Sequence, residues 1–365
     1  MTAGTLASLS NSVFASLGLS GVSDELGIGE SPSGRECIVL IDGMGSQLIA
    51  QYGREFPIFG QSIFEKELSS HFPTTTTVNL TSLATGVLPG IHGMLGYTVR
   101  VPRSGEPGRL LNALKWDERV DPLIWQSVPT LFERASVEGI STSQISAKRY
   151  EGTGFTRAAL RGANYVGANL ISEISDEAAK VLRKEKSFAY VYINHLDVAG
   201  HEDGVGSEKW LLALATVAKL LTELKEKLPP GTRVWVTADH GMVNADEIII
   251  FGKDNDLDKD VTLYGGEPRA RHLYVRDGAA RDVISRYRNY LGTKAEVLSK
   301  DEAISNNLFG NQMSVDSEER IGDIIVIANG GLILVDPERV KEEAGMVGHH
   351  GGLSEVERLI PLLAY

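Results

Sequence analysis

Residues 37–45 read CIVLIDGMG, five apolar residues followed by an aspartate in a turn that contains two glycines. Apolar runs of the same kind occupy residues 188–193, 234–237, 324–328 and 360–364. Helical patterns lie between them, and the clearest spans residues 207–228, where apolar residues recur on one face until Pro229 ends the pattern. Strands that are buried on both faces and separated by helices are typical of parallel sheets. The sequence therefore predicts an α/β fold with a mostly parallel central sheet.

Two segments are predicted to be insertions at the ends of these strands. Residues 102–122 combine proline, glycine and mixed charge without periodicity, as a loop that covers or walls a pocket does. Residues from about 255 to 319 contain their own strand pattern at 271–276 and helix pattern at 279–291, which predicts a small inserted α/β subdomain. Residues 1–35 are weakly patterned and predict one or two short helices. We expect one large domain, residues 1–365, that carries this subdomain.

The composition excludes some classes of function. The chain has 36 basic and 48 acidic residues, a formal charge of −12, so it does not bind nucleic acid through bulk positive charge. No apolar stretch reaches the roughly 18 to 20 residues of a membrane helix, and the first residues lack the basic start and apolar core of a secretory signal. We therefore expect a cytoplasmic protein with no membrane partner. The single cysteine, Cys37, lies in an apolar run and is expected to be buried rather than catalytic.

Acidic residues follow three of the predicted strands. Asp42, Asp197 and Asp239 lie just beyond the runs at 37–41, 188–193 and 234–237. Open α/β sheets bind ligands at the carboxyl ends of their strands. Carboxylates gathered at one such edge repel each other unless a cation lies between them. Their common position therefore indicates a metal site more strongly than any one of these aspartates does alone.

Histidines accompany these aspartates. His201 lies one helical turn after Asp197, His240 follows Asp239 directly, and the adjacent His349 and His350 occupy a glycine-rich turn near residue 350. Mixed carboxylate and imidazole ligands suit zinc, or less often manganese or iron. The other four histidines have no comparable partners and are expected to be structural: His71, His92, His195 and His272.

The segment HFPTTTTVNLTSLATG, residues 71–86, contains candidate nucleophiles. A proline followed by threonines at the start of a helical pattern brings a hydroxyl to a helix N-terminus, where free backbone N–H groups attract anions. The alternative is a threonine that only caps the helix. The pattern alone does not choose among the four threonines.

Taken together, these segments resemble the nucleotide pyrophosphatase/phosphodiesterase family of the alkaline phosphatase superfamily, in its compact bacterial form. The resemblance extends from Asp42 to Ser354 and implies a three-layer α/β/α core. It rests on Pro73-Thr74-Thr75-Thr76, Asn79, Thr85-Gly86 and His92-Gly93, besides the acidic residues and histidines above. The resemblance implies that Thr76 is the nucleophile. It also implies two zinc ions, one bound by Asp42, Thr76, Asp239 and His240 and the other by Asp197, His201 and His350, the last in preference to His349.

The implied function is hydrolysis of phosphodiester or pyrophosphate bonds in small molecules, with nucleotides as the expected partners, through a covalent phospho-threonine. Tyr97 stands where many members of the family have a phosphate-binding asparagine, and Tyr97 and Asn79 are the expected substrate contacts. The aromatic residues Tyr97, Trp116, Trp125 and Phe155 are candidates for stacking on a base. The sequence does not predict the leaving group or the oligomeric state.

Other activities are possible on the same ligand set. A phosphomonoesterase or a phosphonate hydrolase is the first alternative, although a monoester dianion needs a nearby cation and no arginine or lysine lies between Thr74 and Tyr97. Arg100 or Arg103 would have to reach into the site instead. A sulfatase is disfavoured because the nucleophile segment contains no cysteine. A non-catalytic metal-binding relative is disfavoured because all seven matched positions carry competent ligands.

Overall fold

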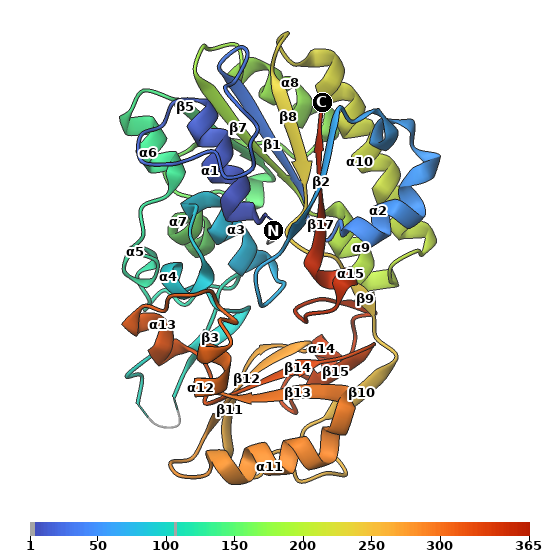
Figure 1. Ribbon diagram of the computed structural model, residues 1–365. Helices are drawn as coiled ribbons and strands as arrows, with labels where there is room; N and C mark the ends of the chain where they lie inside the picture. The colour runs from blue at the N-terminus through green and yellow to red at the C-terminus, as the bar shows by residue number, and fades with distance from the viewer. Residues whose placement is uncertain (1–3, 106–107) are drawn as a thin grey trace.

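The computed structural model of the protein describes residues 4–105 and 108–365 (Figure 1). Its main element is a seven-stranded sheet. In spatial order the strands are β2 (Phe64–Ser69), β17 (Leu359–Ala364), β8 (Arg233–Thr237), β1 (Arg35–Ile41), β7 (Ser187–Ile193), β5 (Ser141–Ser146) and β6 (Asn164–Gly167). Four of the five apolar runs predicted as strands lie in this sheet, within β1, β7, β8 and β17.

The sheet is mostly parallel, which confirms the predicted fold class. Strand β1 pairs in parallel with β7 and β8, and β5 pairs in parallel with β7 and β6. Only β17 runs in the opposite direction, antiparallel to β8 and β2 among the described strands. The carboxyl ends of β1, β7 and β8 therefore meet at one edge of the sheet. Cys37 is buried within β1 and forms no disulfide.

Helices cover both faces of this sheet (Figure 1). One group packs together around α3 (Thr76–Thr85) and comprises α1 (Leu6–Ser16), α6 (Leu131–Val137) and α7 (Gly154–Ala159). The other group packs around α10 (Glu208–Lys227) and includes α8 (Ile171–Val181) and α9 (His195–Asp203), with α2 (Ser46–Tyr52) against β17. Helix α10 is the helix predicted at 207–228, and the side chain of Ser207 caps it by accepting the N–H of Trp210.

A second, smaller sheet lies beyond the carboxyl edge of the first (Figure 1). Its order is β11 (Val261–Glu267), β12 (Ala270–Val275), β14 (Ile324–Ala328) and β13 (Ala295–Ser299), all antiparallel. Helix α11 (Ala280–Leu291) buries Val283, Tyr287 and Leu291 in a separate apolar cluster with this sheet. The run at 324–328 was expected in the parallel sheet, and this placement corrects that prediction: burial on both faces does not determine which sheet a strand joins.

The small sheet includes β14, which lies outside the range 255–319 predicted for the inserted subdomain. Nearby, β10 (Glu247–Ile250) pairs in parallel with β15 (Leu332–Val335), and β9 (Val243–Asn244) pairs with β16 (Gly348–His349). The division of the chain into one domain with an inserted subdomain stays a prediction.

The segment 102–122 was expected to lack regular structure. Part of it, β4 (Leu110–Asn112), instead forms a hairpin with β3 (Thr98–Arg100), while residues 106 and 107 lie outside the described range. The remaining helices are short: α4 (Pro89–His92), α5 (Pro122–Trp125), α12 (Lys300–Ser305), α13 (Val315–Arg320), α14 (Val340–Glu343) and α15 (Glu355–Arg358).

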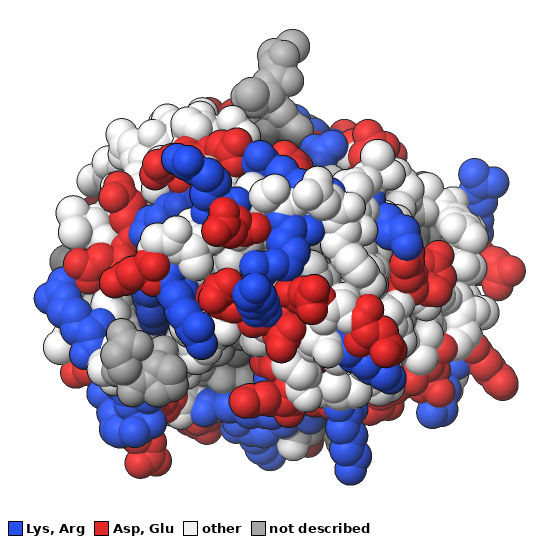
Figure 2. All heavy atoms as spheres, turned by 90° about the horizontal axis from the view of Figure 1, so that it is seen from below, with Lys and Arg blue, Asp and Glu red and all other residues white. Residues whose placement is uncertain are grey.

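Positive and negative residues are interspersed on the face seen from below in Figure 1, on the side of α11 (Figure 2). Among the described residues, no helix has the length and apolar character needed to cross a membrane.

Candidate active site

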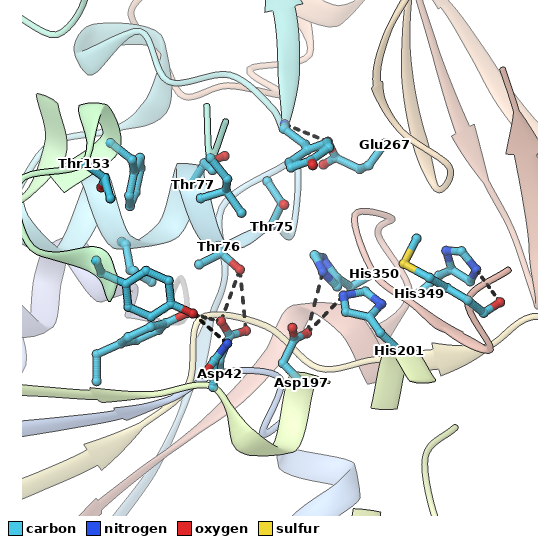
Figure 3. A pocket seen from close by; sticks show the side chains of 18 of the residues that line it. Asp42, Thr75, Thr76, Thr77, Thr153, Asp197, His201, Glu267, His349 and His350 are labelled. Atoms are coloured by element: carbon cyan, nitrogen blue, oxygen red, sulfur yellow. Dashed lines mark hydrogen bonds and ion pairs between the residues drawn. The ribbon is translucent and has the colours of Figure 1, made fainter. Parts of the chain in front are cut away.

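The three aspartates predicted at strand ends, Asp42, Asp197 and Asp239, meet at the carboxyl edge of the main sheet. Figure 3 shows two of them, Asp42 and Asp197. Asp42 follows β1, Asp239 lies two residues after β8, and Asp197 lies in the first turn of α9, after β7. Gly43 has φ +77° and donates its N–H to Oδ1 of Asp239 at 3.2 Å. A Cβ atom on Gly43 would lie 3.2 Å from Cα of Asp197, so this turn needs glycine to bring the aspartates together.

A cavity of about 340 Å³ opens beside these carboxylates. Its walls combine the threonine segment, aromatic residues and a charged group near α14. Among the residues that line it are Asp42, Thr75, Thr76, Thr77, Tyr97, Tyr150, Phe155, Tyr192, Asp197, His201, Glu267, Arg339, Glu342, Glu343, His349 and His350.

The first cluster of metal-ligating atoms consists of Asp42, Asp239 and His240, all buried. One ligand atom from each lies within 4.8 Å of the others. Nδ1 of His240 lies 3.0 Å from the carbonyl oxygen of Gly241, so the Nδ1–H donates to that carbonyl. Nε2 then presents its lone pair to Oδ1 of Asp42 at 3.4 Å and Oδ2 of Asp239 at 3.5 Å. Three electron-pair donors thus converge on one point.

The second cluster consists of Asp197, His201 and His350. Oδ1 of Asp197 lies 3.4 Å from Nε2 of His201 and 3.8 Å from Nε2 of His350. Each imidazole again directs Nδ1 at a backbone carbonyl, His201 at Gly348 (2.8 Å) and His350 at Thr74 (2.9 Å). This orientation leaves both Nε2 atoms facing the carboxylate (Figure 3). His349 directs Nε2 at the Met346 carbonyl instead and is not part of the cluster.

The electrostatics of both clusters fit bound cations. Burial, and then the charges of Asp197 and Asp239, raise the pKa of Asp42 well above its usual range. Burial also raises the pKa of Asp239, and it holds the pKa of His350 well below the ordinary value, with a further contribution from His240. Oδ2 of Asp239 and Oδ1 of Asp197 are buried without hydrogen-bond partners in the described structure. The rings of His240 and His350 stack at 3.7 Å, so the two clusters adjoin. Two adjacent divalent cations would satisfy these unpaired donors.

Thr76 is the threonine whose hydroxyl faces the first cluster. Its Oγ1 lies 3.4 Å from Oδ2 of Asp42 and 3.3 Å from Nε2 of His240. Two of the other hydroxyls are directed elsewhere: Thr74 donates to the carbonyl of Gly352, and Thr77 donates to the carbonyl of Gly96. Thr76 is also the only one of the four that is not fully buried.

The capping alternative does not account for this segment. Thr75 occupies the N-cap position of α3, yet its side chain makes no capping hydrogen bond. Thr76 is the first helical residue, where backbone N–H groups have no partner within the helix. Thr75, Thr76 and Thr77 all line the cavity, so this end of the helix borders it.

Asn79 lies behind the threonine segment rather than in the cavity. Its side chain accepts the N–H of His71 at 2.8 Å and donates to the carbonyls of Pro73 and Thr75. Asn79 is fully buried and does not line the cavity. The expectation that Asn79 contacts substrate does not fit this position, because its polar atoms are already bonded to the loop that carries Thr76.

Tyr97 lines the cavity, as expected of a substrate contact, and its N–H donates to Oε2 of Glu267 at 2.9 Å. Phe155 lines the cavity too, whereas Trp116 and Trp125 do not. Arg100 and Arg103 also lie outside it, where Arg100 donates to the Glu319 carbonyl and Arg103 pairs with the Glu319 carboxylate.

Three polar residues are notable among the cavity residues that were not predicted from the sequence. Arg339, just before α14, contributes a guanidinium. Tyr192 on β7 donates its hydroxyl to Oδ2 of Asp42. Glu267 has a buried Oε1 without a partner in the described structure, and burial raises the pKa of Glu267 to about 8. A sequence signal existed only for Tyr192, which is the last residue but one of the predicted strand 188–193. Arg339 and Glu267 reach the cavity through tertiary structure alone.

The fold of this chain is similar to that of several proteins of known structure. No curated protein matches the chain. Murine ectonucleotide pyrophosphatase / phosphodiesterase 5 has a similar structure, with a TM-score of 0.70 and 15% identity over 91% of this chain and 88% of that one. An inactive variant of that protein, in complex with AMP, has the same TM-score and identity, over 91% of this chain and 87% of that one. Phosphonoacetate hydrolase from Sinorhizobium meliloti 1021, in complex with phosphonoacetate, has a TM-score of 0.67 and 18% identity over 92% and 90%.

The family model for type I phosphodiesterase / nucleotide pyrophosphatase matches residues 37–353. This range extends from β1 to the loop that follows His350, and so includes every residue of both clusters. The chain therefore belongs to the type I phosphodiesterase / nucleotide pyrophosphatase family and is a hydrolase.

Proposed function

We propose that this protein hydrolyses phosphodiester or pyrophosphate bonds of small, nucleotide-type molecules, with Thr76 as the nucleophile. The observation that carries the proposal is the position of the Thr76 hydroxyl, 3.3 Å from Nε2 of His240 and 3.4 Å from Oδ2 of Asp42, at the N-terminus of α3. A nucleophile, a set of metal-ligating atoms and unpaired backbone N–H groups are thereby gathered around one cavity.

Two zinc ions fit the donor sets best, and manganese or iron would use the same atoms. One ion would be held by Asp42, Thr76, Asp239 and His240 and the other by Asp197, His201 and His350. When bound, such ions lower the pKa of a coordinated hydroxyl and stabilise negative charge on the oxygens around phosphorus. Tyr192 and the three backbone carbonyls that bind Nδ1 atoms orient the ligands beforehand.

The residues of the chain then act in two steps. Oγ1 of Thr76 bonds to phosphorus while the bond to the leaving oxygen breaks, and that oxygen keeps the electron pair. The hydroxyl proton passes to solvent. In the second step a water molecule bonds to phosphorus, the bond between Oγ1 and phosphorus breaks, and Thr76 regains a proton. The unpaired N–H groups at the start of α3 stabilise the phosphoryl oxygens in both steps.

The decisive experiment removes the hydroxyl of Thr76. Thr76→Ala should lower turnover of an aryl phosphodiester by about a thousandfold or more, because no nucleophile remains, while the purified variant still contains metal. Thr81→Ala is the matched control, since the Thr81 hydroxyl bonds to the Thr77 carbonyl and does not line the cavity. Wild-type turnover in Thr76→Ala would contradict the proposal. So would purified protein that contains no transition metal and gains no activity when metal is added.

A phosphonate hydrolase or phosphomonoesterase is the second candidate, and Arg339 is the observation in its favour. The cavity does contain a cation that could hold a dianion. Turnover of an aryl diester, the matching aryl monoester and phosphonoacetate should be compared at equal concentration. A clear preference for the diester supports the first proposal, and a preference for either of the others replaces it.

A further inference from the structure

Arg339 is the only arginine or lysine among the described residues that line the cavity. Acidic residues line it too, among them Glu267, Glu342 and Glu343. A single cation in an otherwise acidic cavity marks the point where an anionic group of a ligand is best accommodated.

The guanidinium of Arg339 lies near two carboxylates that have closer partners. Nη2 is 3.4 Å from Oε1 of Glu342, and Nη1 is 3.4 Å from Oε1 of Glu343. Oε1 of Glu342 also pairs with Lys115 at 3.1 Å, and Oε2 of Glu343 accepts a hydrogen bond from Arg271. These two ion pairs use one contact from each terminal nitrogen, and a guanidinium has five N–H donors, so Arg339 can still donate to a ligand in the cavity.

The charge of Arg339 is maintained in this position. Burial alone would disfavour the protonated guanidinium, but the carboxylates of Glu343 and Glu342 outweigh it and raise the pKa of Arg339. The side chain is 21% exposed, so solvent only partly screens it. A planar guanidinium can donate two parallel hydrogen bonds to one phosphoryl group, which a lysine cannot do.

Tyr97 connects Arg339 to the nucleophile segment. Cζ of Arg339 lies 5.6 Å from the centre of the Tyr97 ring. The carbonyl before Tyr97, that of Gly96, accepts the hydroxyl of Thr77 at 3.1 Å, and Thr77 follows Thr76 on α3. A molecule whose phosphorus is at Thr76 can therefore extend along Tyr97 to the guanidinium.

Another part of the cavity wall is apolar. Leu80, Tyr150, Phe155 and Leu160 line it with apolar and aromatic groups. Thr153, which caps the helix of Phe155, lies across the cavity from Glu267, to which Tyr97 is bonded (Figure 3). The cavity therefore suits a molecule with an apolar or aromatic group on one side of the reacting phosphorus and an anion on the other.

We propose that Arg339 is a specificity-determining residue that binds an anionic leaving group, and that the preferred substrates are phosphoric anhydrides rather than esters with an uncharged leaving group. This inference rests on the proposed function and refines its substrate class. As Oγ1 of Thr76 bonds to phosphorus, the bond from phosphorus to the bridging oxygen breaks, and the departing phosphate keeps the electron pair. The guanidinium stabilises the negative charge that grows on this phosphate.

Two substrates with the same transferred group test the proposal. Thymidine 5′-triphosphate already carries phosphate charges on its leaving side when it binds. The p-nitrophenyl ester of thymidine 5′-monophosphate carries no charge on its leaving side until the bond breaks. Arg339→Gln should lower kcat/KM about 10- to 100-fold for the triphosphate, as loss of a hydrogen bond between charged groups does, and less than about threefold for the ester. Arg339→Lys should lower kcat/KM for the triphosphate less than Arg339→Gln does, because lysine keeps the positive charge. Arg103→Gln is the matched control, since Arg103 is exposed and outside the cavity.

A binding measurement adds a readout that does not depend on turnover. The α,β-methylene analogue of thymidine 5′-triphosphate should bind to Arg339→Gln about tenfold or more weakly than to the wild type in calorimetry, with the unfolding temperature of the variant confirming that it is folded. Equal losses on both substrates, or unchanged turnover of the triphosphate, would overturn the role of Arg339. Wild-type protein that cleaves neither substrate would instead contradict the proposed hydrolase function.

Discussion

The hydroxyl of Tyr192 donates a hydrogen bond to Oδ2 of Asp42, so strand β7 orients a carboxylate that follows the neighbouring strand β1. The two strands are paired in register, with Leu40 opposite Tyr192. This contact fixes one oxygen of Asp42 and leaves the carboxylate facing His240 and Thr76. Tyr192 is therefore a positioning residue for the first cluster.

We predict that Tyr192→Phe weakens zinc binding about 10- to 100-fold, because hydrogen bonds to a metal ligand fix its orientation. Competition with a chelator of known affinity measures the change. Tyr190→Phe is a matched control on the same strand, since the Tyr190 hydroxyl is buried and forms no hydrogen bond in the described structure. Equal zinc affinity in Tyr192→Phe and the wild type would contradict the positioning role.

Metal removal should destabilise the fold, and the effect should grow with pH. The pKa values of Asp42 and Asp239 are raised in the folded protein by burial and by neighbouring carboxylates. In the metal-free protein their contribution to stability is therefore greatest below the unfolded pKa of about 4 and is lost as the pH rises through their folded values. A divalent cation such as zinc, held by the ionised carboxylates, would reverse this loss. The difference in Tm between zinc-loaded and chelator-treated protein should widen from pH 5 to pH 8, and a constant difference would refute this account.

A buried histidine away from the clusters, His92, predicts sensitivity to acid. His92 accepts the N–H of Met94 at Nδ1 and contacts the Ser82 hydroxyl through Nε2 at 2.9 Å, so its neutral form is fully bonded. Burial, with His71 and Arg320 nearby, holds the pKa of His92 well below its usual value. Because the folded pKa is depressed, stability is present above about pH 6.5 and is lost by about 1.4 kcal/mol per pH unit as the pH falls.

Urea unfolding of the wild type and His92→Asn at pH 7.5 and pH 5.5 measures this contribution. The variant should be less stable at pH 7.5, because it loses packing and a hydrogen bond, yet lose less stability between the two pH values. Parallel losses in both proteins would show that His92 does not carry the effect.

The loop of His350 is held by a buried ion pair. Glu357 accepts hydrogen bonds from Arg269 with both carboxylate oxygens, at 3.0 and 2.8 Å, and its Oε1 also accepts the N–H of Gly352 at 2.8 Å. Glu357→Gln should destabilise the protein by about 3–5 kcal/mol, because Arg269 is left buried without a counter-charge. It should also weaken metal binding through the displaced loop. Glu177→Gln, which removes an exposed pair with Lys180, should change stability by less than about 1 kcal/mol in the same denaturant titration.

Much of the main sheet could be predicted because its central strands are buried on both faces. The runs at 37–41 and 188–193 are apolar for that reason and lie within β1 and β7. Strands at the edge of the sheet or beside the cavity have a more polar sequence. Strand β2, at the edge, reads FEKELS and exposes its charged residues. Strand β5 reads STSQIS, and its Gln144 and Ser146 line the cavity. Neither has the apolar pattern of a buried strand, so neither was predicted.

Some residues of the candidate site could likewise be predicted from the sequence, and others could not. Asp42, Asp197 and Asp239 were predictable because each follows a strand and parallel strands end together. Arg339 was not, because its place beside Tyr97 depends on how α14 packs against a loop far away in the sequence. Local patterns encode which residues end a strand, and they do not encode which side chains meet across a cavity.

The position of β17 in the main sheet has a consequence for synthesis on the ribosome. Among the described strands, β2 pairs only with β17, which follows it by most of the length of the chain. While the chain is being made, β2 is translated early and its edge stays open until β17 emerges. The charged residues of β2, Glu65, Lys66 and Glu67, protect that edge against pairing with other chains until β17 has been translated.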